Sequence, residues 1–148
     1  MPYFTYDTSV LISRGLTNLR NMPSRFLLSS VVLMELMAGA RDTSRRKFYE
    51  QMFAVYRKDE TLIVPDTDDW LLASKIMFSL THIRKRTQRG RLKSLPIGAS
   101  QRLALDVLIA VSARRRKAIV VTENWHDFKL IQRYCNATIV RASEFFRV

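Results

Sequence analysis

Four acidic residues of this sequence lie inside or close beside apolar segments, where a freely solvated carboxylate is not expected. They are Asp7, Glu35, Asp106 and Asp127. Ionised carboxylates are seldom buried unless a partner compensates their charge. The chain has 25 Lys and Arg against 13 Asp and Glu, a formal net charge of +12, so acids in apolar surroundings stand out. A shared cation explains all four, and carboxylate oxygens are ligands that Mg²⁺ and Mn²⁺ prefer.

Asp7 and Asp127 each follow a segment with the pattern of a β-strand. Residues 3–6 predict a short strand that ends at Asp7, and the apolar run 118–121 predicts a buried strand shortly before Asp127. Either acid could instead cap the helix that follows it. These alternatives need a separate explanation for each acid, whereas one cation accounts for the set.

Glu35 and Asp106 lie within segments that predict buried helices. Glu35 lies in a helix expected over residues 30–38, and its neighbours on the same helical face are apolar. Asp106 lies in a helix expected over about 101–116, where Arg102 one turn earlier offers an alternative ion-pair partner.

Polar residues cluster after the strand expected at 118–121. Thr122 and Asn124 could orient a carboxylate, a water molecule or a phosphate, or they could be ordinary turn residues. Glu123 is an alternative to Asp127 as the fourth acid, but it lies between two polar residues and we expect it to point away.

Strands and helices are expected to alternate along the chain. The expected strands are 3–6, 26–29, 61–64, 118–121 and 138–140. The expected helices begin near Val10 and then span 30–38, 43–58, about 66–86, about 101–116 and a short segment from about His126, with a basic loop at 87–101. This alternation predicts an α/β fold, a three-layer α/β/α sandwich with a mostly parallel sheet of four to five strands. At 148 residues, the chain is expected to form a single domain over 1–148.

This topology brings the four acids to one edge of the sheet. Ligands of open parallel sheets bind beyond the carboxyl ends of the strands. Asp7 and Asp127 lie at or just past such ends, and Glu35 lies in the first two turns of the helix after the second strand. The helix that carries Asp106 runs opposite to the fourth strand, so its N-terminal part returns to the same edge. We therefore predict one site built from residues far apart in the sequence.

Basic residues concentrate in three segments, 41–47, 84–102 and 114–117. Each segment alone could be a solvated surface, but the three together favour a polyanionic partner, either nucleic acid or an acidic protein. The residues expected to contact phosphate groups all lie in the second segment: Arg84, Lys85, Arg86, Arg89, Arg91, Lys93 and Arg102.

Other features argue against a secreted, zinc-binding or membrane protein. Cys135 is the only cysteine, so no intrachain disulfide can form and we expect a reducing, cytoplasmic environment. His82, His126 and Cys135 lack the spacing of zinc ligands. No apolar run approaches the ~18 residues of a membrane span, and the chain begins without the basic stretch of a secretory signal. We expect no membrane partner.

Four segments carry a resemblance to known proteins. They are Asp7–Ile12, Ser29–Gly39, Leu105–Ala110 and Val121–Phe128. In this order they resemble the PIN-domain nucleases and, within them, the VapC-type toxins of bacterial and archaeal toxin–antitoxin pairs. The resemblance implies a set of site residues: the principal acids Asp7, Glu35 and Asp106, a more variable fourth acid Asp127, and the polar neighbours Thr122 and Asn124.

The resemblance also implies an activity and partners, namely Mg²⁺- or Mn²⁺-dependent cleavage of RNA, a cognate antitoxin that holds the activity in check, and a homodimer. A non-catalytic RNA- or protein-binding domain on the same fold is the main alternative. A phosphoacceptor receiver domain is disfavoured because Asp7 has no acidic neighbour and Arg141 stands where such a domain has a lysine. A metal-independent ribonuclease would use His82 and His126.

Overall fold

The computed structural model describes residues 2–86 and 99–147, in which strands and helices alternate as expected. The strands are β1 (Tyr3–Tyr6), β2 (Leu28–Ser29), β3 (Leu62–Ile63), β4 (Ala118–Thr122) and β5 (Ile139–Arg141). The helices are α1 (Thr8–Ser13), α2 (Ser30–Ala38), α3 (Thr43–Lys58), α4 (Thr67–Arg86), α5 (Ala99–Arg115), α6 (Trp125–Gln132) and α7 (Ala142–Phe145), with a 3-10 turn η1 (Leu19–Asn21). The helix expected from about residue 101 already begins at Ala99, and residues 87–98 of the expected basic loop lie outside the described part.

All paired strands run parallel. β1 pairs with β4 and β4 with β5, while β2 pairs with β3 in a second, two-stranded sheet. A parallel bridge between Phe4 and Phe26 connects the two sheets, and the Leu27 N–H donates to the Phe4 carbonyl at 2.8 Å. The strands therefore follow the order β3-β2-β1-β4-β5. The prediction of a parallel α/β sheet is confirmed, although the segment expected as a strand over 26–29 is regular only at Leu28–Ser29.

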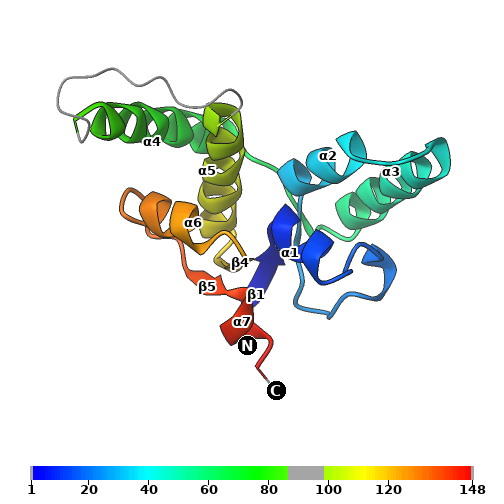
Figure 1. Cartoon of the computed structure of the whole chain (residues 1–148). Coiled ribbons are helices and arrows are strands. Elements are labelled where there is room, and N and C mark those ends of the chain that lie inside the picture. Colours follow the sequence, from blue (N-terminus) through cyan, green and yellow to red (C-terminus); the bar gives the residue numbers. More distant parts are fainter. Residues whose placement is uncertain (1, 87–98, 148) are drawn as a thin grey trace.

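Helices lie on both sides of the strands. In Figure 1, α4, α5 and α6 lie to the left of β1, and α2 and α3 lie to its right. The central helix α5 packs against α2, α4, α6 and β4. A helix covered on all sides is apolar around its whole circumference, and every residue over 107–113 of α5 is buried. Asp106 directly precedes this buried part, near the middle of α5.

Aromatic rings connect the first strand to the last helix. The Phe145 ring lies 5.0 Å from that of Phe4 and 5.9 Å from that of Tyr6, measured between centroids. Phe26 packs against both β1 rings as well. These contacts explain α7, which is too short for a sequence pattern to predict and is held in place by tertiary packing.

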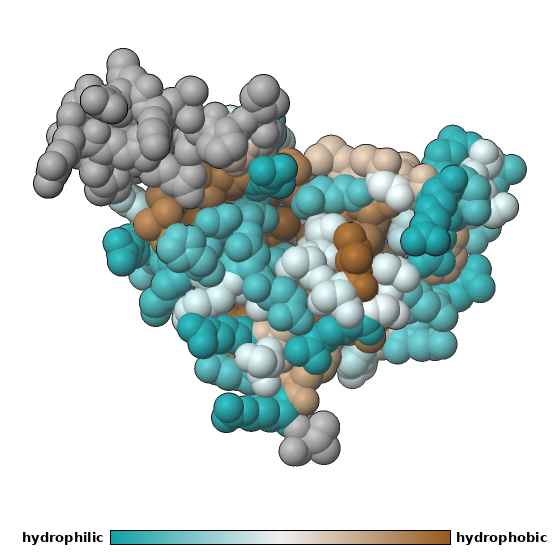
Figure 2. All heavy atoms as spheres, in the orientation of Figure 1, coloured by the Kyte–Doolittle hydropathy of each residue, from teal (hydrophilic) through white to brown (hydrophobic). Residues whose placement is uncertain are grey.

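The surface of the molecule is mostly polar on the face shown in Figure 2, with hydrophobic side chains in smaller areas between hydrophilic ones. Large exposed apolar residues include Ile12 on α1 and Phe78 on α4. Within residues 2–86 and 99–147, none of the helices has both the length and the apolar character needed to cross a lipid bilayer.

Candidate functional site

The carboxylate of Asp7 is buried at the end of β1 and is held by neutral hydrogen-bond donors. Only 3% of the residue is exposed. Oδ1 accepts a hydrogen bond from the Ser9 hydroxyl at 2.7 Å and one from the Val10 N–H at 3.1 Å, so Asp7 also caps α1. Oδ2 accepts from the Thr122 hydroxyl at 2.6 Å. Burial raises the pKa of Asp7, the hydrogen bonds offset part of this rise, and the charge of Glu123 adds to it.

Asn124 connects two further acids to Asp7. Its side-chain Nδ2 donates to Asp106 Oδ2 at 3.3 Å and to Asp127 Oδ2 at 3.1 Å, and its backbone N–H donates to Thr122 Oγ1 at 2.7 Å. Asn124 occupies the N-cap of α6, where an Asn side chain commonly accepts from the helix. Here it makes no such capping bond and faces the acids. Neutral polar groups thus join three acids in one hydrogen-bonded chain.

Asp106 has a strongly perturbed ionisation. Burial and then the charges of Asp7, Glu35 and Asp127 raise the pKa of Asp106 to about 7, and the hydrogen bond from Asn124 offsets part of the rise. Repulsion of this kind requires the carboxylates to lie close together, because it weakens with distance. The structure therefore brings Asp7, Glu35, Asp106 and Asp127 to one place, which we call the acid cluster.

Glu35 belongs to the acid cluster and has an oxygen without a partner. α2 begins directly after β2, where the Ser29 hydroxyl caps it, and this places Glu35 beside the strand exits. Burial raises the pKa of Glu35, the nearby Thr8 hydroxyl counters the rise, and the charge of Asp7 adds to it. Neither Glu35 Oε1 nor Thr8 Oγ1 has a hydrogen-bond partner among the described residues, although both atoms are buried. Buried polar oxygens without a partner are uncommon, so these two atoms stand out beside the acid cluster.

Glu123 is held by a basic partner outside the acid cluster. Its Oε1 accepts from Arg14 Nε at 3.0 Å, and the Glu123 side chain is 36% exposed. The Ser13 hydroxyl lies 3.4 Å from the same oxygen. Glu123 thus pairs with a guanidinium, although its charge still raises the pKa of Asp7. The choice of Asp127 over Glu123 as the fourth acid stays a prediction.

The chemistry of the acid cluster fits a hard divalent cation, although its carboxylates are not arranged as the ligands of one ion. As the side chains stand, no three or more His, Cys, Asp or Glu residues in the described ranges are arranged to hold a metal ion. Both oxygens of Asp7 accept hydrogen bonds, and Asp106 and Asp127 share the Asn124 amide. Nevertheless, the donors are all oxygens, they repel one another, and Glu35 Oε1 has no partner. Binding an ion therefore requires side-chain rotation.

The residues expected to contact phosphate groups fall mostly outside the described part of the chain. This holds for the side chains of Arg84, Lys85, Arg86, Arg89, Arg91 and Lys93. Arg102 is described and exposed on α5, and Asp106 bonds to Asn124 rather than to it. One contact that sequence reasoning missed is the donation from Ser9 to Asp7, which the spacing of a helix cap could have indicated.

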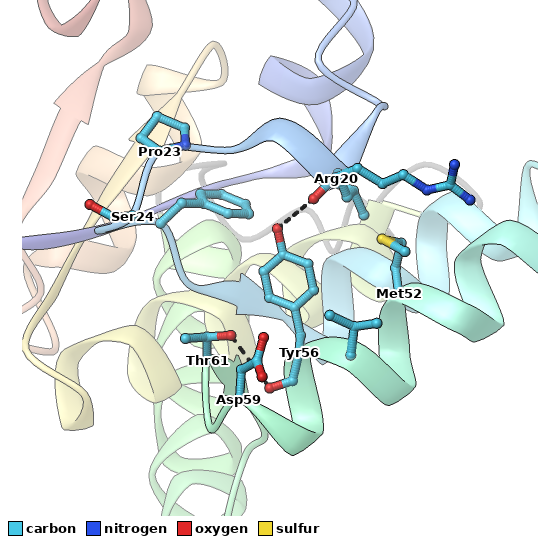
Figure 3. Close-up of a pocket in the computed structure, with 10 residues that line it drawn as sticks. Arg20, Pro23, Ser24, Met52, Tyr56, Asp59 and Thr61 are labelled. Atoms are coloured by element: carbon cyan, nitrogen blue, oxygen red, sulfur yellow. Dashed lines mark hydrogen bonds between the residues drawn. The ribbon is translucent and has the colours of Figure 1, made fainter.

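A separate hollow lies between η1 and the C-terminal half of α3 (Figure 3), and none of the four acids lines it. Its volume is about 410 Å³. The Tyr56 hydroxyl donates to the Leu19 carbonyl at 2.8 Å. Burial and the charge of Asp59 raise the pKa of Tyr56 to about 12, so this hydroxyl remains a donor. We interpret the hollow as a structural feature.

Chains from three solved complexes are similar to this one over nearly its whole length. A chain of DNA-bound VapBC from Salmonella typhimurium is 23% identical, with a TM-score of 0.52 over 95% of this chain and 98% of that one. A chain of FitAB bound to an IR36 DNA fragment is 16% identical, with a TM-score of 0.54 over 93% and 94%. A chain of VapBC-1 from nontypeable Haemophilus influenzae is 20% identical, with a TM-score of 0.51 over 94% and 97%.

These similarities establish the fold. No protein-family model and no curated protein sequence matches the chain. At the identities of the three complexes, the shared feature is the arrangement of strands and helices. The parallel α/β fold expected from the sequence is thereby confirmed as the fold of chains in VapBC and FitAB complexes.

Proposed function

We propose that this chain is the toxin of a toxin–antitoxin pair and that it acts as an endoribonuclease dependent on Mg²⁺ or Mn²⁺. The observation that carries the proposal is the acid cluster, in which the other three acids contribute to raising the pKa of Asp106 to about 7. The fold shared with chains of VapBC and FitAB complexes supports the toxin role. The nuclease role rests on the chemistry of the acids.

The proposed reaction is hydrolysis of an RNA phosphodiester bond, with the cation held by Asp7, Glu35, Asp106 and Asp127. A divalent cation at such a site lowers the pKa of a bound water and stabilises charge on the phosphodiester. The Thr122 and Ser9 hydroxyls orient the Asp7 carboxylate without neutralising it. Asn124 does the same for two further acids and fixes their spacing. The neighbours of the acid cluster thus act as positioning residues.

The proposed partner that inhibits the chain is an antitoxin with an acidic segment. The net charge of +12 favours an acidic protein as well as RNA. A homodimer and a cytoplasmic location belong to the same proposal. The test is the reading frame beside the gene, which is expected to encode a small protein with a DNA-binding end and an acidic tail. Its co-purification with this chain supports the pairing, and failure to bind counts against it.

Cleavage of RNA by the purified chain tests the nuclease role. We expect cleavage with Mg²⁺ or Mn²⁺, none after chelation, and a loss of about a hundredfold or more for Asp7→Asn and Asp106→Asn, because each removes a candidate ligand. Asp68→Asn is the matched control, since Asp68 is exposed on the first turn of α4. Full activity in either ligand variant would overturn the assignment.

A non-catalytic RNA- or protein-binding domain remains the second candidate, and it is favoured by the lack of a preassembled metal-binding group among the described residues. It predicts RNA binding without turnover, whatever the cation. Cleavage that is indifferent to chelators would instead favour a metal-independent reaction at His82 and His126.

A further inference from the structure

A cavity of about 400 Å³ opens beside the acid cluster, and Glu35 forms part of its wall. Ile12 of α1 and Leu36 of α2 contribute apolar walls, while Arg41 and Arg45 contribute cationic ones. The cavity is large enough for a small ligand of nucleotide size. Its lining therefore combines apolar surface, two guanidinium groups and two carboxylates, those of Asp42 and of the candidate catalytic acid Glu35.

Arg45 is held in a fixed orientation by groups that do not neutralise its charge. Its Nη2 donates to the Thr17 carbonyl at 2.9 Å, and its Nε donates to the Tyr49 hydroxyl at 3.2 Å. The guanidinium also lies over the Phe48 and Tyr49 rings, at 4.6 and 4.9 Å from their centroids. It forms no ion pair with a carboxylate among the described residues. A preorganised and uncompensated guanidinium is well suited to bind an anion.

Arg41 adds a second positive charge at the same cavity. Its side chain is exposed and makes no hydrogen bond or ion pair with the described residues. The neighbouring Asp42 is already engaged, because its Oδ1 accepts from the Arg45 N–H at 2.7 Å and caps α3. The capping acid therefore holds the start of the helix while both arginines remain available.

We propose that this cavity is an RNA subsite that seats the nucleotide next to the bond at the acid cluster. In this arrangement Arg41 and Arg45 bind the adjacent phosphate, and Ile12 and Leu36 pack against the base or ribose. Successive phosphates of one strand then meet the acid cluster and the two arginines in turn. This inference rests on the proposed function and specifies how its substrate is held.

The subsite lies on the other side of β1 from α4. Arg41 lies in the connection between α2 and α3, and Arg45 lies in the first turn of α3. Both helices lie to the right of β1 in Figure 1, whereas α4 lies to its left. An acidic peptide is the other class of ligand that two arginines attract. We favour RNA because Glu35 links the cavity to the acid cluster, where a phosphodiester is the proposed substrate.

RNA binding without cleavage tests the subsite. Binding of a short fluorescein-labelled single-stranded RNA is measured by anisotropy in a chelating buffer over a series of salt concentrations. We expect Arg41→Ala and Arg45→Ala each to weaken binding about tenfold and to reduce the slope of log K against log salt by about 0.7. Arg46→Ala is the matched control, because it removes one charge from the same helix while Arg46 pairs with Glu50.

The controls separate a binding role from a structural one. Arg45→Ala removes contacts to Thr17 and Tyr49 and could loosen the fold, so circular dichroism accompanies each variant. Arg41→Ala removes no described contact. If Arg45→Ala proves unstable, the RNA binding of Arg41→Ala decides the test. Arg45→Lys keeps the charge but loses the planar fork, so we expect weaker binding with an unchanged salt slope.

Each outcome bears on the inference in a defined way. If the variants bind RNA as Arg46→Ala does while the wild type cleaves RNA, the subsite is wrong and the proposed function stands. If the variants lose binding while the wild type cleaves nothing with Mg²⁺, the subsite stands and the nuclease role is wrong. The subsite is overturned if the wild type does not bind RNA. It is also overturned if the arginine variants bind RNA normally and lose only the binding of a polyglutamate peptide, used as a probe for an acidic partner.

Discussion

Two buried carboxylates of this chain have opposite surroundings. Asp69, 5% exposed, accepts from Arg115 Nε at 2.8 Å. Asp7, 3% exposed, accepts only from two hydroxyl groups and a backbone N–H. One carboxylate is neutralised by a guanidinium, and the other is held in place with its charge intact.

This difference separates a structural ion pair from the proposed metal site. The chain contains 25 Lys and Arg, so cations are abundant. Even so, Asp7, Glu35 and Asp106 form no ion pair within the described ranges, and burial raises the pKa of each. Neutral donors orient a carboxylate without removing its attraction for a metal ion. The arrangement destabilises the free protein, as functional sites commonly do.

The arginine corner, defined as Arg115 and Arg116, shows the opposite principle. Arg115 pairs with Asp69 and Asp66 and donates to the Val64 carbonyl at 2.7 Å. Arg116 donates to the Glu60 carbonyl at 2.9 Å and to the Leu62 carbonyl, at the start of β3, at 3.2 Å. Two residues of the basic segment 114–117 therefore clamp β3 to α5, rather than forming a free cationic surface.

The largest loss of stability is expected at the arginine corner. Arg115→Ala leaves Asp69 buried without its cation, and we expect a loss of about 3 kcal/mol in the free energy of unfolding. Urea denaturation measures this change. Arg114→Ala removes the same charge from an exposed neighbouring residue and serves as the control. Equal stability of the two variants would show that the pairing of Arg115 with Asp69 does not stabilise the fold.

Removal of a charge from the acid cluster is expected to raise the stability of the metal-free protein, in contrast to the arginine corner. Asp106→Asn removes a charge that burial and three neighbouring acids disfavour, so we expect it to stabilise the metal-free protein at neutral pH by on the order of 2 kcal/mol. The amide oxygen can still accept from Asn124. The same variant should lose most of the stabilisation that added Mg²⁺ gives the wild type. Thermal denaturation with and without Mg²⁺ measures both effects, and a destabilised metal-free variant would contradict the electrostatic account.

Most of the fold could be predicted from the sequence, because local patterns determine it. The helix expected over 43–58 has those bounds in the structure, and the acids Asp7 and Asp106 lie near one another as parallel strand exits require. The convergence of the acids needed only the direction of each strand and helix. Their roles as metal ligands stay predictions.

The finer contacts could not be predicted, because they depend on positions that only the folded chain defines. Nothing local distinguishes Asn124 as a donor to two acids from Asn124 as a helix cap. The spacing in α3 places Glu50 one turn after Arg46, but nothing local shows that Arg45 lines a cavity together with Glu35. In both cases the sequence states a residue type, and the tertiary packing selects its partner.

The pH dependence of stability sharpens the contrast further. The pKa of Asp106 is about 7 in the folded state against 3.8 for an unperturbed Asp, so the folded state holds the extra proton between these values. Stability of the chelated protein therefore falls as pH rises from about 4 to 7 and levels off above that range. Bound Mg²⁺ displaces the proton, so its stabilising effect grows over the same range. Thermal midpoints in EDTA measure this decrease in stability, and Asp106→Asn should make the decrease smaller. An equally steep decrease in that variant would show that other groups cause it.

The smallest effect is expected at Glu123, which lies close to the acid cluster but has a cationic partner of its own. Exposed ion pairs contribute ~0–1 kcal/mol, and the Arg14 and Glu123 side chains are 34% and 36% exposed. We therefore expect Glu123→Gln to change stability by less than about 0.5 kcal/mol and to leave RNA cleavage intact. Asp127→Asn is the matched variant, because it removes an acid that Asn124 holds beside Asp106, and it should reduce cleavage clearly. Loss of cleavage in Glu123→Gln with normal cleavage in Asp127→Asn would exchange the roles of the two acids, and it would show that a guanidinium partner does not exclude a carboxylate from the reaction.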